Sequence, residues 1–121
     1  MIFEPLMNSA KRGELILVNG GFCHWHLRRD RQITIREIIV LPEHQRKGIG
    51  TAMLEQLKQV ESATFIFAKC PADLEANEWY QARGFVDEGT ETTRSGRVLR
   101  LWRLQLCSTA QMVMHGLRRS Q

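Results

Sequence analysis

The chain has 121 residues, which is enough for one domain and too few for two, so residues 1–121 are expected to form a single domain. Its composition, 43% hydrophobic and 25% charged, is that of an ordinary soluble globular protein. The net charge of +4 favours an anionic ligand or partner, such as a phosphorylated cofactor, an acidic protein or a nucleic acid, without choosing between them.

The cysteines and the apolar runs indicate the cellular environment. Cys23, Cys70 and Cys107 are odd in number and far apart, so neither a disulfide framework nor a zinc knuckle is supported. Reduced thiols are typical of a cytosol-like compartment. No run approaches the roughly 18 apolar residues of a membrane span. The N-terminus has neither the basic start nor the apolar core of a signal peptide. We therefore expect a cytoplasmic protein that does not span a membrane.

Three strands are predicted first along the chain. Residues 14–18 (ELILV) form a short apolar run, and the Asn19-Gly20 pair that follows is a strong hairpin turn signal. Residues 22–29 alternate in polarity, and residues 32–41 are rich in isoleucine and valine. These runs predict an antiparallel meander that ends at Pro42, because proline cannot donate a hydrogen bond to a sheet.

The second half of the chain alternates between helices and strands. Helical periodicity begins at Ile49, and residues 63–68 (ATFIFA) then form a buried strand that could pair parallel with the third strand. The remaining predicted elements are a helix over 74–83 capped by Asp73, a hairpin of residues 85–88 and 97–106, and an amphipathic helix within 108–119. The predicted fold class is therefore α/β with a mixed sheet, in the order βββ-α-β-α-ββ with a candidate C-terminal helix.

The loop QRKGIG, between the third strand and the first helix, has the character of an anion-binding turn. Free N–H groups and the helix dipole at a helix N-terminus favour negative charge. A P-loop is excluded because Lys47 precedes Gly48 instead of following the last glycine. A dinucleotide fingerprint is excluded because no third glycine follows Gly50 at the required spacing. A plain strand-to-helix turn remains an alternative.

A fourth interpretation accounts for the context of the loop. The stretch VLPEHQRKGIGTAML, residues 40–54, resembles motif A of the GNAT family of N-acetyltransferases, whose signature is Q/R-x-x-G-x-G/A. A second stretch, NEWYQARGF at residues 77–85, is similar to the family segment in which a helix ends in glycine and the next strand begins with phenylalanine. Together with their order and separation, the two matches extend the resemblance over roughly residues 33 to 105.

The resemblance implies a GNAT-like acyl-CoA N-acyltransferase fold that binds acetyl-CoA as a cosubstrate. Backbone N–H groups of the loop would hold the pyrophosphate, because the glycines keep side chains away. In the family, the strand before the loop splays from the next parallel strand, and the pantetheine arm bonds main-chain groups in the gap. The implied cofactor-binding residues are Ile38, Ile39, Val40, Gln45, Arg46, Lys47, Gly48, Ile49, Gly50 and Thr51, with Asp73 and Asn77 as weaker candidates near the second helix.

Tyr80 and Glu37 are the candidate catalytic residues. Tyr80, the only tyrosine, aligns with the position that family members use as general acid toward the CoA sulfur. A structural tyrosine is the alternative. Glu37 lies among isoleucines, where a carboxylate is disfavoured as the anion, which suits a general base. A surface glutamate or an ion pair is the alternative. The third strand is apolar on both faces around Glu37, so either both faces are buried or a bulge shifts the register, as in family members.

Other polar residues give weaker signals. His24 and His26 share a strand face, but no third metal ligand is apparent, so no metal is expected and solvent contact or an acceptor groove is favoured. The position where some relatives carry a second glutamate is Ala68. Four arginines near the C-terminus are more consistent with solvent or cofactor contacts than with nucleic-acid bases. They are Arg94, Arg97, Arg100 and Arg103.

The chain departs from the family at its N-terminus. Typical members begin with a strand and two helices that wall the acceptor site, whereas about 13 residues precede the first clear strand here. The acceptor cleft is thus either open, which suits a protein amine, or covered by the C-terminal tail or a second subunit of a homodimer. The predicted function is transfer of an acetyl group from acetyl-CoA to a primary amine. The alternatives are a non-catalytic CoA-binding or partner-binding module and a small basic nucleic-acid binder.

Overall fold

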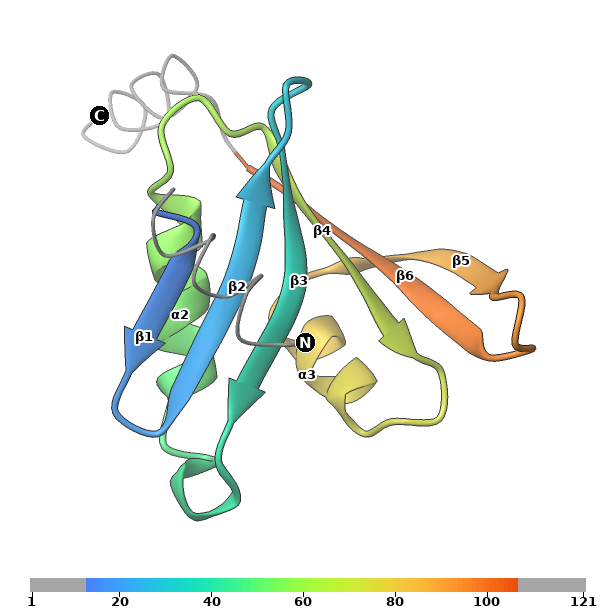
Figure 1. Cartoon of the computed structure of the whole chain (residues 1–121), viewed down its shortest axis with the longest axis horizontal. Helices are drawn as coiled ribbons and strands as arrows, with labels where there is room; N and C mark the ends of the chain where they lie inside the picture. Colours follow the sequence, from blue (N-terminus) through green and yellow to red (C-terminus); the bar gives the residue numbers. More distant parts are fainter. Residues whose placement is uncertain (1–12, 107–121) are drawn as a thin grey trace, which may run out of the picture.

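In the computed structural model, which describes residues 13–106, the chain forms one mixed six-stranded sheet with helices on one face (Figure 1). The sheet order is β1-β2-β3-β4-β6-β5, which confirms the predicted element order and the mixed α/β class. The predicted helix within 108–119 lies outside the described residues. The strands are β1 (Leu15–Val18), β2 (Gly21–Leu27), β3 (Gln32–Val40), β4 (Phe65–Pro71), β5 (Val86–Thr92) and β6 (Val98–Gln105), and the helices are η1 (Pro42–His44), α2 (Ile49–Lys58) and α3 (Ala76–Ala82).

The first three strands form the predicted antiparallel meander, and α2 packs against them. The apolar residues of α2 recur at helical spacing, and Met53, Leu54 and Leu57 are buried. They face the α2 side of β2 and β3, where Cys23 and Ile33 have no exposed surface. Burial of a large aliphatic side chain is worth about 1.5–3 kcal/mol, so this contact holds α2, and hence its N-terminus, in place against the sheet.

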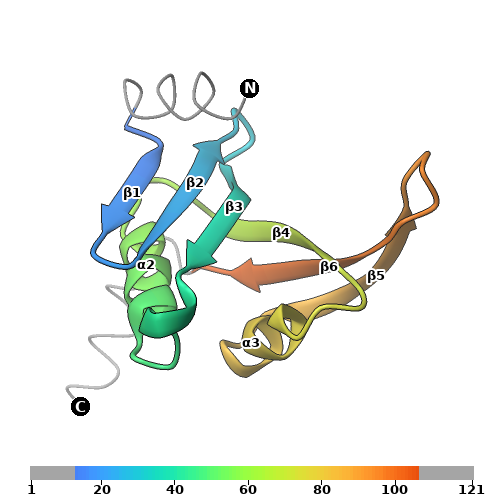
Figure 2. The ribbon, with the colours of Figure 1, turned by 60° about the horizontal axis from the view of Figure 1, so that its bottom comes forward.

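The sheet divides where β3 and β4 diverge. Among residues 13–106, the two strands pair in parallel only from Gln32 to Ile35 on β3, and the rest of β3 has no strand partner on that side. β4 pairs along its whole length with β6 instead. In the turned view, β1, β2 and β3 with α2 form one part, and β4, β5 and β6 with α3 form the other (Figure 2). The expected splay of the third strand from the following parallel strand is thus present.

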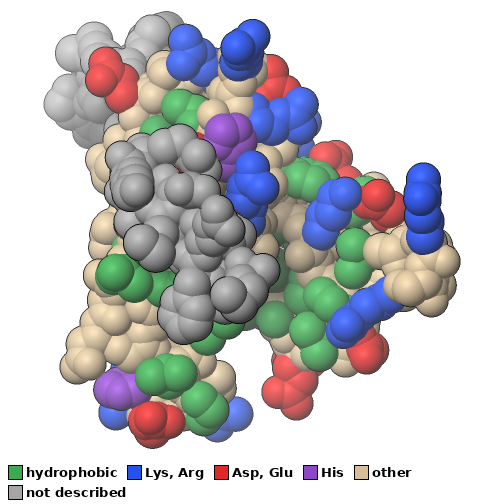
Figure 3. Space-filling view, viewed as in Figure 1, with side chains coloured by type: hydrophobic (Ala, Val, Ile, Leu, Met, Phe, Trp, Pro, Cys, Tyr) green, Lys and Arg blue, Asp and Glu red, His purple; other side chains and the backbone are tan. Residues whose placement is uncertain are grey.

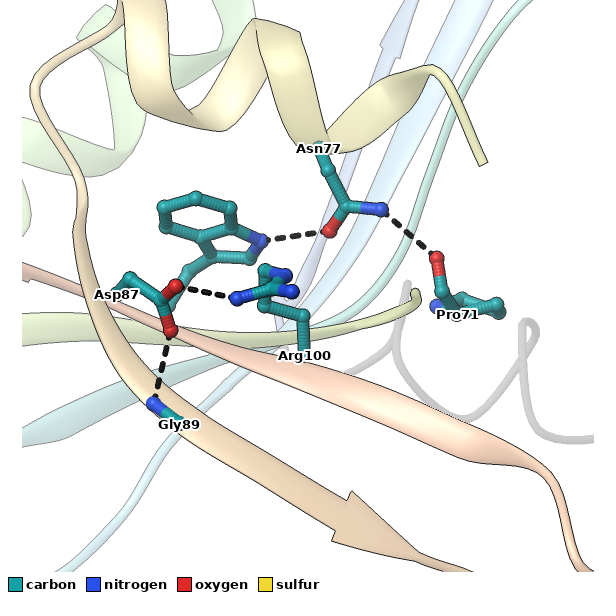
Figure 4. A network of polar contacts seen from close by, with 6 residues as sticks. Pro71, Asn77, Asp87, Gly89 and Arg100 are labelled. Atoms are coloured by element: carbon teal, nitrogen blue, oxygen red, sulfur yellow. Dashed lines mark hydrogen bonds and ion pairs between the residues drawn. The ribbon is translucent and has the colours of Figure 1, made fainter. Parts of the chain in front are cut away.

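A polar network attaches α3 to the second part of the sheet (Figure 4). The Asn77 side-chain amide donates to the carbonyls of Pro71 and Leu74, both at 2.8 Å, and its oxygen accepts a 2.9 Å hydrogen bond from the indole of Trp102. The predicted cap is wrong, because α3 begins at Ala76 and Asp73 makes no capping bond. The residues between β4 and α3 form a turn instead, and the Asn77 side chain bonds the carbonyl of Leu74 in this turn and that of Pro71 at the end of β4.

The remaining differences from the predicted elements lie at their ends. β5 continues to Thr92, beyond the predicted end at 88, and every one of its residues is exposed. Cys23 and Cys70 are free thiols, as expected, and Cys107 lies outside the described residues. Within residues 13–106, the longest apolar helical segment falls short of what is required to cross a membrane.

Candidate functional site

A cleft of about 800 Å³ opens at the divergence of β3 and β4. In the space-filling view, an open notch separates the lobe that carries η1 from the lobe that carries α3 (Figure 3). Eight of the predicted cofactor-binding residues line the cleft, and five further residues complete the lining. The eight are Ile38, Val40, Gln45, Arg46, Gly48, Ile49, Gly50 and Thr51, and the five are Leu74, Glu75, Ala76, Trp79 and Arg83.

The N-terminus of α2 forms one wall of the cleft. Gly48 is the N-cap in a left-handed conformation, with φ of 82°, which glycine adopts without the steric cost that a Cβ imposes. No side chain caps this end, and the first intrahelical bond runs from the Ala52 N–H to the Gly48 carbonyl at 2.9 Å. The N–H groups of the first three helical residues therefore have no intrahelical acceptor. The first turn also contains no acidic residue, so this wall favours an anion.

A bulge in β3 prepares the second wall. Glu37 pairs with His24 and Ile35 pairs with Trp25, so Arg36 is the extra residue. Of the two alternatives that the sequence left open, burial of both faces or a bulge, the structure has the bulge, which brings Ile38 to the same sheet face as Ile35. It lies one residue beyond the last β3 residue that pairs with β4, so the change of face and the splay coincide.

Main-chain groups of β3 face the gap. The Leu41 N–H donates to the Gly20 carbonyl at 2.7 Å, on the β2 side. Because neighbouring strand residues direct their N–H and C=O groups to opposite sides, Ile38 and Val40 direct theirs away from β2. The Gln45 side chain donates to the Val40 carbonyl at 3.0 Å. Within the described part of the chain, the N–H groups of Ile38 and Val40 and the Ile38 carbonyl have no hydrogen-bond partner on the gap side, so they are placed to bind an extended ligand.

Helix α3 supplies the wall that sequence reasoning missed. Trp79 lies over the start of α2, since a Cβ built on Gly50 would come within 3.4 Å of its indole ring. The Arg83 guanidinium donates to the Thr51 hydroxyl at 3.1 Å. Trp79 and Arg83 are four residues apart and so share a helix face. This spacing is the one sequence signal that could have predicted a shared role for them.

Tyr80 is buried beneath the sheet and does not line the cleft. Its side chain is 5% exposed and contacts Phe85 edge-on at 5.1 Å and Trp102 in a stacked arrangement at 6.2 Å between ring centroids. Burial raises the pKa of the Tyr80 hydroxyl, and the nearby Cys70 and Cys23 thiols raise it further. The hydroxyl is therefore protonated at neutral pH.

Glu37 occupies the other face of β3. It is half-buried and pairs across the strands with His24, whereas its neighbour Ile38 lines the cleft on the helix side. His26 bonds the carboxylate of Glu14 at 2.5 Å through Nδ1. Among residues 13–106, no three His, Cys, Asp or Glu side chains are grouped as a metal site would require. Glu37 and the two histidines therefore lie on the sheet face opposite the cleft.

The other predicted cofactor-binding residues lie outside the cleft lining. Ile39 is exposed on the face opposite the cleft, and Lys47 does not line the cleft. Asp73 is largely exposed and lies 3.9 Å from Arg97. Both amide hydrogens of Asn77 are used within the protein, so its evident role is structural. Contacts of these four residues with a cofactor stay predictions.

The C-terminal arginines mostly have protein partners. Besides Arg97, Arg100 pairs with Asp87, and Arg103 stacks over the Phe65 ring at 4.0 Å. Arg94 lies in the turn between β5 and β6. These contacts belong to the second part of the sheet, away from the cleft lining, so the idea that they bind the cofactor's anionic end stays a prediction.

Comparison with known families decides the membership of the chain. The model of the acetyltransferase (GNAT) domain matches residues 9–87, which is more than half of the sequence. The chain belongs to the GNAT acetyltransferase family. Residues 9–87 include the meander, the glycine loop, the cleft and Tyr80. Among curated proteins, none matches the chain.

Solved structures of GNAT-type acetyltransferases share the fold at low identity. A Bacillus subtilis acetyltransferase in complex with CoA is 19% identical with a TM-score of 0.66, and the match covers 86% of this chain and 84% of that one. The ribosomal-protein-S18-alanine N-acetyltransferase of Escherichia coli is 20% identical with a TM-score of 0.63, covering 85% and 77%. A Bacillus anthracis acetyltransferase with acetyl coenzyme A is 21% identical with a TM-score of 0.64, covering 73% of this chain. The GNAT chain described here spans 57% of that structure and 62% and 64% of two others.

Proposed function

We propose that this GNAT protein transfers an acetyl group from acetyl-CoA to a primary amine. The observation that carries the proposal is the uncapped N-terminus of α2 at the mouth of the gap between β3 and β4. An uncapped helix start suits a pyrophosphate, and unpaired strand groups suit the amide-bearing pantetheine arm. The solved B. anthracis and B. subtilis acetyltransferases, which were crystallised with acetyl-CoA and CoA, support this choice of cosubstrate.

The cleft offers separate groups for the phosphates and for the pantetheine arm of acetyl-CoA. The N–H groups of Ile49, Gly50 and Thr51 would bind the phosphates, with the basic side chain of Arg46 beside them. The main-chain groups of Ile38 and of Val40 would bind the pantetheine amides. Acetyl-CoA supplies a thioester, an acyl group already activated for attack by an amine.

Two side chains would handle the protons of the transfer. As the new N–C bond forms and the C–S bond breaks, the sulfur needs a proton. Tyr80 does not line the cleft of the free protein, so its hydroxyl would donate this proton only if the bound donor brings the sulfur within reach of it. The attacking amine loses a proton, which Glu37 would accept directly or through water. Glu37 lies on the sheet face opposite the cleft, so we infer that the donor enters from the helix side and the amine from the other.

The acceptor is proposed to be an amine of a protein. The sheet face that carries Glu37 also exposes Leu17, at 72% of its surface, and Ile39, at 37%, which favours a large partner over a small enclosed molecule. The E. coli structure with the same fold is a protein-alanine acetyltransferase by its description. The cytoplasmic location and the homodimer expected from the sequence stay predictions.

Thermal melting with acetyl-CoA and an assay of CoA release test the proposal. Acetyl-CoA at 100 times its dissociation constant is expected to stabilise the protein by about 2.7 kcal/mol. Release of free CoA thiol is then measured over a panel of peptides with free N-termini or lysines. No melting shift at millimolar acetyl-CoA would contradict donor binding. A shift without acetyl transfer to any amine would favour the non-catalytic CoA-binding module.

A further inference from the structure

Two arginines line the cleft, Arg46 and Arg83, and among residues 13–106 neither lies within 4 Å of a carboxylate. Among residues 13–106, the basic side chains of Arg28, Arg97, Arg100, Lys58 and Lys69 each lie within 4 Å of a carboxylate. Arg83 has no such carboxylate in that part of the chain, and its hydrogen bond goes to the uncharged Thr51 hydroxyl. A guanidinium has five N–H donors, and this bond uses one of them. Arg83 therefore keeps donors and a full positive charge for a ligand.

The position of Arg83 selects which ligand group it would meet. Thr51 is the third residue of α2, so the guanidinium lies beside the N–H groups that have no intrahelical acceptor. Trp79, one turn earlier on α3, packs over Gly50 and keeps the two helices close. An anion at the start of α2 would thus have backbone donors on one side and the arginine on the other.

We propose that Arg83 binds the pyrophosphate of the acyl donor and contacts it from the α3 side of the cleft. This rests on the proposed function, because it presumes that the donor is acetyl-CoA. Arg83 would replace or share its bond to Thr51 with phosphate oxygens, which it can bind through two parallel hydrogen bonds. Arg83 caps the C-terminus of α3, and Tyr80 lies three residues earlier in that helix. The arginine would therefore also help to fix the position of the proton donor when acetyl-CoA is bound.

A purely structural brace is the competing explanation. In that case the bond from Arg83 to Thr51 only holds α3 against α2, and its loss would lower the affinity for every ligand of the cleft by a similar factor. Loss of a phosphate-binding arginine would weaken the binding only of ligands that carry the pyrophosphate. The two explanations therefore differ for pantetheine, which lacks it.

The test compares Arg83→Gln and Arg83→Lys with Arg29→Gln, which removes the same charge at an exposed position in the turn between β2 and β3. Dissociation constants are measured for acetyl-CoA and dephospho-CoA by calorimetry and for pantetheine by NMR titration. Arg83→Gln is expected to weaken acetyl-CoA and dephospho-CoA by roughly 10- to 100-fold, the range of a charge-assisted hydrogen bond. The affinity for pantetheine should change by less than about twofold. Arg29→Gln should match the wild type, and the affinities of Arg83→Lys should fall between those of the wild type and Arg83→Gln.

Several results would overturn the assignment. Unchanged acetyl-CoA affinity in Arg83→Gln would remove Arg83 from the site, and an equal loss for pantetheine would make it a brace. A loss seen with acetyl-CoA and absent with dephospho-CoA would assign Arg83 to the 3′-phosphate instead. A melting temperature of the ligand-free variant equal to that of the wild type controls for folding. Failure of the wild type itself to bind acetyl-CoA would instead contradict the proposed function.

Discussion

At the scale of single residues, a substitution at Tyr80 can distinguish a catalytic role of its hydroxyl from a packing role of its ring. Tyr80→Phe removes the hydroxyl and keeps the ring against Phe85 and Trp102. We expect the rate of acetyl transfer to fall by about 100-fold, the contribution of a positioned general acid, with acetyl-CoA affinity within about threefold of wild type. Transfer is measured by CoA release, and binding by calorimetry.

The pH dependence follows from the burial of the same side chain. Because burial raises the pKa of Tyr80 above its ordinary value, the hydroxyl keeps its proton as the pH rises through about 10, where an exposed tyrosine ionises. No loss of activity from Tyr80 ionisation is therefore expected between neutral pH and about pH 10.

Phe85→Leu is the packing control for Tyr80→Phe, since it loosens the aromatic cluster and keeps the proton donor. An unchanged rate in Tyr80→Phe would show that the tyrosine is structural.

At the scale of elements, Asn77 determines how α3 attaches to the sheet. Asn77→Ala removes the acceptor for the Trp102 indole, which is buried, and the donors for two carbonyls. Leaving such groups without partners costs about 1–3 kcal/mol of unfolding free energy. Urea unfolding measures the loss, and Gln56→Ala, an exposed position on α2, should stay within about 0.5 kcal/mol of wild type. Equal stability of both variants would show that α3 is held by its aromatic contacts alone.

The sequence predicted best the elements whose buried residues recur with the regular spacing of a strand or a helix. Residues 32–41 and the helix from Ile49 have a clear apolar pattern, and β3 and α2 lie where it predicts them. β5 is exposed along its whole length, so no alternation marked its end. The late start of α3 depends on the bonds of Asn77 to the preceding turn, and side-chain bonds of this kind leave no periodic signal.

At the scale of the whole molecule, the cleft exists because two parts of the sheet share only four residues of parallel pairing. The glycine loop and the β3 wall could be predicted, since the family motif is local in sequence. The α3 wall could not, because Trp79 and Arg83 reach the start of α2 only after β4 has placed α3 beside it. A donor that contacts both parts would therefore join them.

Hydrogen exchange at single amides measures whether bound acetyl-CoA contacts β3 in the gap. The N–H groups of Ile38 and Val40 face the gap and have no strand partner there among residues 13–106, so they should exchange quickly in the free protein. The Leu41 amide, which bonds Gly20, is the control on the same segment and should exchange slowly in both states. With acetyl-CoA at 100 times its dissociation constant, exchange at Ile38 and Val40 should slow by up to about 100-fold, because these amides are open only in the unbound fraction. If their exchange were unchanged while acetyl-CoA stabilised the protein, the donor would bind elsewhere than along β3.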